Sequence, residues 1–301
     1  MNILAWWRQF PILLALWASL PTAQAQGVTT PTLDRIREHG AIYVGHREAS
    51  MPFSYMIGDE VVGYSADICE RIVGAIRERL GLPTLKVVQV PVTGFSRILM
   101  LMTGTIDLEC GSTTNTKIRQ QRVAFSVTTF VSGVKTLVRK DAGIDRIADL
   151  AGKVVVTTSG TATERLVKTV LAVRNLPAAR TRTASKHAES FSMVLSRQAD
   201  AFVLDEPILA GLLASSSDAG KLKLLEENFG FEPYGIGMRR DDPEFKKLVD
   251  DTLVGMMKSG ELEKLYAKWF MSPIPPNNIN LQMPMSSMLR DLLRNPSDTG
   301  I

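Results

Sequence analysis

Apolar residues recur every three or four positions between Tyr64 and Leu80, and this spacing predicts an amphipathic helix. Gly81 and Pro83, which follow it, are residues that end helices. Short apolar runs on either side are typical of buried strands, so strands and helices alternate along this part of the chain. Such alternation predicts a sheet covered by helices. The expected strands are 41–44, 86–90 and 106–110, and the other expected helices are 32–39 and 96–103.

The alternation restarts after residue 133 and predicts a second lobe of the same α/β type. Near the end of the chain, Asp242 is a capping residue and Pro243 suits the first position of a helix. The tail from Ser272 carries three prolines within five residues and is expected to be irregular. The strands expected here are 134–138, 153–157, 201–204 and 234–238, and the helices are 144–150, 162–173, 189–197, 244–257 and 262–270.

These patterns predict two α/β lobes in one chain. We expect lobe I to comprise residues 31–132 plus 234–301, and lobe II to comprise residues 133–233. The first boundary lies where the alternation restarts. The second lies where a new strand is expected at Tyr234, before the last group of helices.

The first 25 residues differ from the rest and predict a signal peptide. Arg8 is their one charged side chain, an apolar run covers 10–20, and Ala23-Gln24-Ala25 has the small residues that signal peptidase reads. A membrane anchor is the alternative, but the apolar run is shorter than the ~20 residues that a span requires. No cysteine near Ala25 offers a site for a lipid. We therefore expect cleavage after Ala25 and a mature protein free in the periplasm.

Charge and motifs exclude several functions. The 35 basic and 31 acidic residues are interleaved, so neither nucleic acid binding nor a polybasic membrane patch is expected. The motifs of nucleotide-binding loops, serine hydrolases and zinc proteases are absent from the sequence. His39, His46 and His187 stand far apart, so no metal and no cofactor are expected. Cys69 and Cys110 are compatible with one disulfide or with two buried thiols.

Polar side chains follow the predicted strands at the points where the strands end. Ser112 and Thr114 come after strand 106–110, and Arg119 lies in the first turn of the helix that follows. Ligands of open α/β sheets bind at the carboxyl ends of strands, where hydroxyls, free amides and an arginine suit a carboxylate. The alternative is a plain helix cap beside a surface arginine.

The second lobe offers two more corners of this kind. Thr161 and Glu164 form a capping box, which engages the hydroxyl locally, while Gly160 lets a ligand approach the backbone closely. Asp205 follows a predicted strand, where an acid can meet an ammonium group; the alternative is that it caps the next helix. Arg47, Arg97 and His187 stand at similar positions. One such residue is usually structural, but several that converge at strand ends indicate a site.

Several segments are recognisable together. They are Gly45-His46-Arg47-Glu48, Pro52-Phe53-Ser54-Tyr55, Val62-Gly63-Tyr64-Ser65, Glu109-Cys110-Gly111-Ser112-Thr113-Thr114-Asn115, Thr158-Ser159-Gly160-Thr161, Trp269-Phe270 and Pro273-Ile274-Pro275-Pro276. In these segments the chain resembles the periplasmic glutamate/aspartate-binding proteins, in the polar amino acid solute-binding family of ABC importers. The resemblance extends from Leu33 to Asn295, and the run from Cys110 is its most specific part. Ser65 departs from it, because an acid is usual there.

The resemblance implies a type II periplasmic-binding-protein fold, in which two α/β lobes are joined by two crossing strands and hold the ligand in the cleft between them. It also implies L-glutamate or L-aspartate as the ligand, an inner-membrane ABC permease as the partner, and a monomer. Arg119, with the backbone around Thr114 and Thr161, would hold the α-carboxylate. Ser112 and Asp205 would bind the α-ammonium group.

Arg47, Arg97 and His187 would surround the side-chain carboxylate. Three arginines and a histidine against the acid of Asp205 also favour a ligand with an extra carboxylate, because a neutral amino acid would leave buried cations unpaired. Two departures concern the choice between glutamate and aspartate: Gly94 stands where the family often has serine, and Ala162 where it often has threonine.

Two other functions are compatible with this scaffold. Some proteins of the same fold resemble cyclohexadienyl or arogenate dehydratases, which need a general acid in the cleft. Glu206 is the one nearby candidate, and the number of cations favours a small ligand over a ring. The other alternative is a binding domain that only signals to a receptor.

Overall fold

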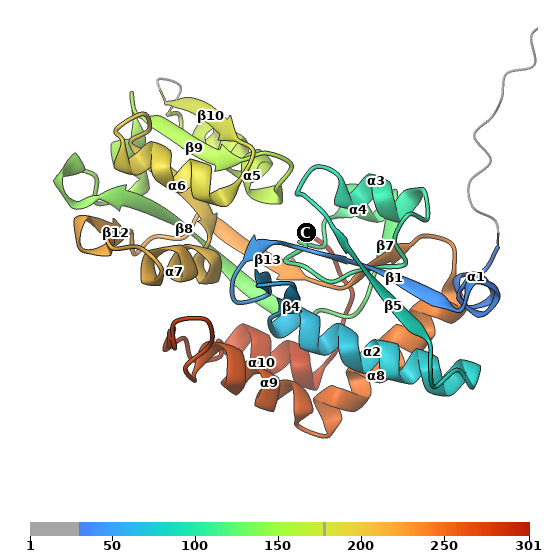
Figure 1. Cartoon of the computed structure of the whole chain (residues 1–301). Helices are drawn as coiled ribbons and strands as arrows, with labels where there is room; N and C mark the ends of the chain where they lie inside the picture. Colours follow the sequence, from blue (N-terminus) through green and yellow to red (C-terminus); the bar gives the residue numbers. More distant parts are fainter. Residues whose placement is uncertain (1–29, 177–178) are drawn as a thin grey trace, which may run out of the picture.

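The computed structural model describes residues 30–176 and 179–301, so the predicted signal peptide lies outside the described residues. Two separate sheets, each flanked by helices, form two lobes that lie side by side (Figure 1). This confirms the expected two-lobed α/β fold. Within the described part of the chain, none of the helices combines the length and the apolar character that crossing a membrane requires.

The first sheet has five strands in the order β5-β1-β6-β14-β7. β5, β1 and β6 are parallel, whereas β14, from far along the chain, joins β6 in the antiparallel sense. Because the parallel strands end at the same edge, the loops after β1 and β6 lie close together. The bounds are β1 Ala41–His46, β5 Lys86–Pro91, β6 Leu108–Glu109, β7 Val123–Phe125 and β14 Gly237–Arg239, and a small sheet is formed by β2 Ala49–Ser50, β3 Ser54–Ile57 and β4 Glu60–Val62.

The second sheet has the order β10-β9-β11-β8-β12, with β13 also paired to β8. β10, β9 and β11 are parallel, so this sheet too brings several strand ends to one edge. The bounds are β8 Phe130–Arg139, β9 Val154–Thr158, β10 Arg180–Ala184, β11 Ala201–Asp205, β12 Leu222–Leu224 and β13 Gly230–Tyr234.

Two antiparallel strands, β8 and β13, cross between the lobes (Figure 1). The chain enters the second lobe along β8 and returns along β13, with Phe130 opposite Tyr234 at the end nearer the first sheet. Both rings pack with Phe53 at centroid distances of 4.8 and 5.0 Å. The crossing strands are therefore anchored in the aromatic core of the first lobe, as the expected fold requires.

Helices cover the sheets and end where the sequence indicates. The helix predicted from Tyr64 to Leu80 has these bounds, and Gly81 ends it in the left-handed conformation at φ 66°. Asp242 caps the helix that follows it by accepting from the amide of Phe245. The helices are α1 Thr32–His39, α2 Tyr64–Leu80, α3 Arg97–Met102, α4 Lys117–Gln120, α5 Ala162–Val173, α6 His187–Leu195, α7 Glu206–Ala214, α8 Pro243–Lys258, α9 Glu261–Phe270 and α10 Ser287–Arg294.

Three expectations about local structure are wrong. Instead of a helix over 144–150, there is one short 3-10 turn over Ile147–Leu150, because Asp149 binds the preceding amides and closes a turn. The strand expected over 234–238 is two strands, β13 and β14, because the amide of Gly235 pairs with Thr113 in another loop. The tail is not irregular throughout, since α10 forms behind the prolines and buries Leu289 and Leu293.

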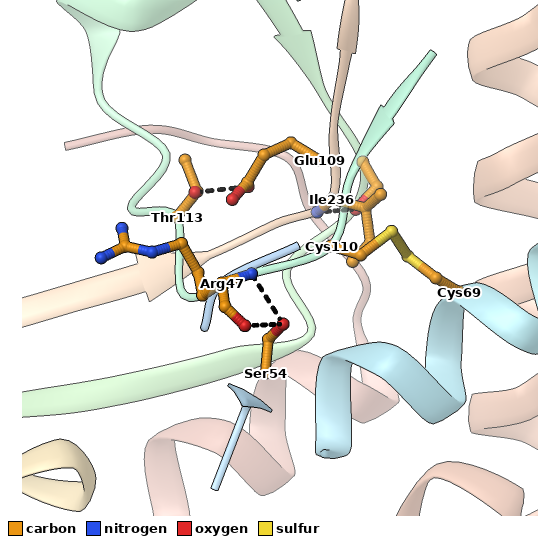
Figure 2. Close-up of a disulfide and its surroundings, with 8 residues drawn as sticks. Arg47, Ser54, Cys69, Glu109, Cys110, Thr113 and Ile236 are labelled. Atoms are coloured by element: carbon orange, nitrogen blue, oxygen red, sulfur yellow. Dashed lines mark hydrogen bonds between the residues drawn. A yellow bond between two sulfur atoms is a disulfide. The ribbon is translucent and has the colours of Figure 1, made fainter. Parts of the chain in front are cut away.

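The two cysteines form a disulfide (Figure 2). Cys69 lies on α2, and Cys110 directly follows β6, with the two Cα atoms 6.2 Å apart. Of the two alternatives that the sequence left open, the structure has the disulfide and not two buried thiols. The bond ties the loop that carries Ser112 and Thr114 to a helix of the first lobe.

Replacing both Cys69 and Cys110 by serine is expected to lower the free energy of unfolding by about 2–4 kcal/mol. The bond closes a loop across a sequence separation of 41 residues, and losing it restores conformational freedom to the unfolded chain. Urea denaturation of the oxidised wild type and of the variant measures the difference. A wild type whose denaturation midpoint does not change with a reducing agent would contradict the prediction.

Candidate functional site

One small hollow collects seven of the eight predicted site residues. It is narrow, with an open volume of about 10 Å³, so the polar side chains that line it lie close to one another. We call it the cleft hollow, because its lining comes from strand ends of both sheets. The lining residues are Arg47, Arg97, Ser112, Thr114, Thr161, Ala162, His187, Asp205, Ile208 and Glu232.

Two arginines of the first lobe meet in the cleft hollow. Arg97 is buried at 2% exposure, and its Nη1 donates to the carbonyl of Ser112 at 3.0 Å and to the hydroxyl of Thr113. Arg47 follows β1, and its backbone is fixed by the hydroxyl of Ser54 (Figure 2). Burial, and then the charge of Arg97, lowers the pKa of Arg47 to about 10. Two guanidinium groups held this close favour an anionic ligand.

Arg119 lies next to the cleft hollow rather than in its lining. Its Nη1 donates to the carbonyl of Thr114 at 2.9 Å, and its Nη2 donates to the carbonyl of Gly160 at 3.1 Å. The side chain therefore bridges the loop after β6 and the loop after β9. Burial, and then the charge of Arg97, lowers the pKa of Arg119 to about 9. A guanidinium has five N–H donors, so three remain for a ligand.

The second lobe contributes a neutral histidine and a capped helix. His187 begins α6, and its Nδ1 lies 2.9 Å from the hydroxyl of Thr158. Burial, and then the charges of Arg47 and Arg97, lowers the pKa of His187 to about 3, so the imidazole is neutral at pH 7. Thr161 caps α5, and its hydroxyl accepts from the amide of Glu164. The Glu164 carboxylate accepts from the amide of Gly160 rather than from that of Thr161, so only half of the predicted capping box forms.

Two buried acids stand on the other side of the cleft hollow. Asp205 ends β11, and its Oδ1 has no hydrogen-bond partner among the described residues. Burial, and then the neighbouring carboxylate of Glu232, raises the pKa of Asp205 well above its usual range. Glu232 lies on β13 at 1% exposure and accepts from the hydroxyls of Thr114 and Thr163. An acid with a free oxygen suits an ammonium group.

Sequence reasoning missed Glu232, because the strand was expected to begin only at Tyr234. The sequence did offer one signal for a buried acid, because Glu232 is a single acidic residue between Phe231 and Pro233. It also missed Glu109, which accepts a hydrogen bond from Thr113 and whose charge counters the lowering of the pKa of Arg47 (Figure 2).

These acids correct the charge count made from the sequence. The arginines Arg47, Arg97 and Arg119 have three acidic side chains near them, Asp205, Glu232 and Glu109, rather than one. The number of cations alone therefore does not favour a ligand with an extra carboxylate. What remains is the arrangement: Arg47 and Arg97 lie near His187, and Asp205 lies near Glu232, while the charge of Arg97 also reaches both acids. We call the part of the cleft hollow lined by Arg47 and Arg97 its cationic end, and the part lined by Asp205 and Glu232 its acidic end.

Metal chemistry has no support in the described ranges 30–176 and 179–301. No three His, Cys, Asp or Glu side chains are grouped there in a way that could hold a metal ion. The polar groups of the cleft hollow instead pair with one another and with backbone carbonyls.

Two α/β lobes joined by two crossing strands, with a buried polar hollow between the lobes, are the features of a solute-binding protein. Residues 42–272 match the model of the bacterial extracellular solute-binding proteins, family 3, and the chain belongs to this family. It is 41% identical over 293 residues to the glutamate/aspartate import solute-binding protein of Escherichia coli (strain K12), covering 96% of this chain and 97% of the relative. It is 43% identical over 272 residues to the L-glutamate/L-aspartate-binding protein of Pseudomonas aeruginosa, covering 89% of each.

Solved structures show the same fold. An ancestral amino acid-binding protein, described as a precursor of cyclohexadienyl dehydratase, is 32% identical with a TM-score of 0.67, over 79% of this chain and 99% of that one. An ancestral arginine-binding protein bound to arginine is 29% identical with a TM-score of 0.68, over 77% and 98%. The relatives of 41% and 43% identity are binding proteins rather than enzymes.

Proposed function

We propose that this protein captures L-glutamate or L-aspartate in the periplasm, as a monomer, and delivers it to an inner-membrane ABC permease. The observation that carries the proposal is the presence in one buried hollow of a cationic end, with Arg47 and Arg97 beside the neutral His187, and of an acidic end, with Asp205. An acidic amino acid carries one ammonium group and two carboxylates, and so has partners for both ends. The names of the two relatives described above, at 41% and 43% identity, support the same ligand.

The placement of the polar groups supports one orientation of the ligand. Arg119 with the backbone near Thr114 and Thr161 binds the α-carboxylate, because these groups meet at the bridge between the two lobes. Ser112 and Asp205 bind the α-ammonium group, and the unpaired Oδ1 of Asp205 supports this role. The side-chain carboxylate then extends toward the cationic end. Lobe I is proposed to span 31–132 plus 234–301, and lobe II 133–233.

The glycine at position 94 supports a close fit between the lobes. A Cβ atom added to Gly94 would lie 2.8 Å from the carbonyl oxygen of Ser159, and one added to Gly160 would lie 2.6 Å from the carbonyl carbon of Gly94. The two backbones therefore pack directly against each other at this point, and a side chain at position 94 would force them apart.

The dehydratase alternative loses its candidate general acid. Glu206 lines a different hollow, together with Phe130 and Gly133 of β8, and not the cleft hollow. Asp205 and Glu232 are the acids that line the cleft hollow. Glu232 accepts from two hydroxyls, and Asp205 keeps an oxygen without a hydrogen-bond partner among the described residues, which suits an ammonium group better than proton transfer to a ring.

Thermal unfolding of the purified protein with each of the twenty common amino acids tests the proposal. At one ligand concentration, a ligand that binds only the folded state raises the melting temperature more the tighter it binds, with the logarithm of its concentration divided by its Kd. Glutamate and aspartate are expected to raise it most, and arginine and lysine not at all. A larger rise with a neutral or basic amino acid would overturn the proposed ligand.

A further inference from the structure

Glu232 connects the two lobes and has no role in the proposed ligand contacts. It lies on β13, one of the two crossing strands, with 1% of its surface exposed. One carboxylate oxygen accepts from the hydroxyl of Thr114, in the loop after β6 of the first lobe. The other accepts from the hydroxyl of Thr163, at the start of α5 of the second lobe, at 2.9 Å.

A second bridge joins the same two segments. Arg119 donates to the carbonyl of Thr114 on one side and to the carbonyl of Gly160 on the other. Gly160 precedes the cap of α5, and Thr163 is in its first turn. Glu232 and Arg119 thus hold the two halves of the proposed α-carboxylate site from either side, one through hydroxyls and the other through carbonyls.

We propose that Glu232 is a positioning residue that aligns Thr114 with the start of α5 when the lobes close on the ligand. The inference rests on the proposed function, because it assumes that these two segments hold the α-carboxylate. Glu232 also lines the cleft hollow, but in this proposal it acts through Thr114 and Thr163, whose hydroxyls donate to its two oxygens. Loss of the bridge lets the second lobe separate more easily, so its main effect is on the rate at which ligand leaves.

A carboxylate suits this role better than an amide. Both neighbours are hydroxyls that donate to Glu232, and each of the two oxygens of a carboxylate accepts one of these hydrogen bonds. Glutamine at this position keeps the length of the side chain, but its oxygen can accept fully from only one of them. Glu232→Gln therefore weakens the bridge while it preserves packing.

A double-mutant cycle tests the inference by calorimetric titration with glutamate. Glu232→Gln and Thr163→Val are each expected to weaken binding by about 10- to 100-fold, mostly through faster dissociation in stopped-flow fluorescence. The double variant is expected to be within about threefold of the weaker single variant, because both changes break the same bridge. A stoichiometry of one ligand per chain shows that each variant is folded.

Thr136→Val is the matched control. Thr136 is a buried threonine of β8 in the second lobe, and its hydroxyl has no hydrogen-bond partner among the described residues. Its affinity is expected to stay within about threefold of the wild type. Effects of Glu232→Gln and Thr163→Val that multiply in the double variant would overturn the inference, as would a Thr163→Val variant with the affinity of Thr136→Val.

Failure of the inference is separate from failure of the proposed function. If the wild type binds a different amino acid and not glutamate, the proposed ligand is wrong, and the same cycle is run with the amino acid that raises the melting temperature most. If the wild type binds glutamate but the two changes are independent, the proposed ligand stands and the role of Glu232 is overturned.

Discussion

Arg119→Ala is expected to weaken the binding of every amino acid ligand by about 2–5 kcal/mol, the range for removing one partner of a buried charge pair. All amino acids share the α-carboxylate, which this side chain is proposed to hold. Arg119 also bridges Thr114 and Gly160, so the two sides of the site lose their connection at the same time. Calorimetric titration with glutamate, aspartate, glutamine and asparagine measures the loss.

Arg119→Lys is the control for the shape of the guanidinium. It keeps the positive charge but loses the planar fork, so it is expected to recover only part of the binding. An alanine variant that binds glutamate as the wild type does would show that the α-carboxylate lies elsewhere. A loss confined to the acidic ligands would show that Arg119 faces the side-chain carboxylate instead.

Arg97→Ala is expected to cost glutamate and aspartate a similar 2–5 kcal/mol while it weakens glutamine and asparagine much less. Arg97 is buried beside Arg47, and its charge lowers the pKa of His187, which places it at the cationic end of the cleft hollow. Only a ligand with a second carboxylate can place a negative charge beside Arg47 and Arg97. The same four titrations measure the change in selectivity.

Arg97 also has a structural contact that needs a control. Its Nη1 holds the loop of Ser112 and Thr113, so alanine removes that support as well as the charge. Arg97→Lys keeps the charge and is expected to retain part of the preference for acidic ligands. Equal losses for acidic and amide ligands in Arg97→Ala would contradict the assignment of this residue to the side-chain carboxylate.

The sequence was sufficient for the parts of the fold that depend on local signals. The helix from Tyr64 to Leu80 matches its predicted bounds, because its apolar spacing and the glycine that ends it are both local. The strand ends that carry Arg47, Ser112 and Asp205 were also predicted within a few residues. Parallel strands bring such ends together in any α/β sheet, so their convergence followed from the fold class.

What the sequence could not supply depends on contacts between distant segments. Glu232 enters the site because β13 pairs with β8, about 100 residues away, and that pairing has no local signal. The direction of the Glu109 side chain, toward Arg47 and Thr113, is also set by tertiary packing. For this reason the sequence predicted the residue types at the site but gave a wrong balance of charge.

Competition between glutamate and glutamine for the wild-type protein tests the central claim most directly. The two ligands have nearly the same shape and differ in the charge that Arg47, Arg97 and His187 are proposed to recognise. Glutamate is expected to bind at least about 30-fold more tightly, which corresponds to about 2 kcal/mol. Equal affinities, or tighter binding of glutamine, would show that the cationic end of the cleft hollow does not select an acidic side chain.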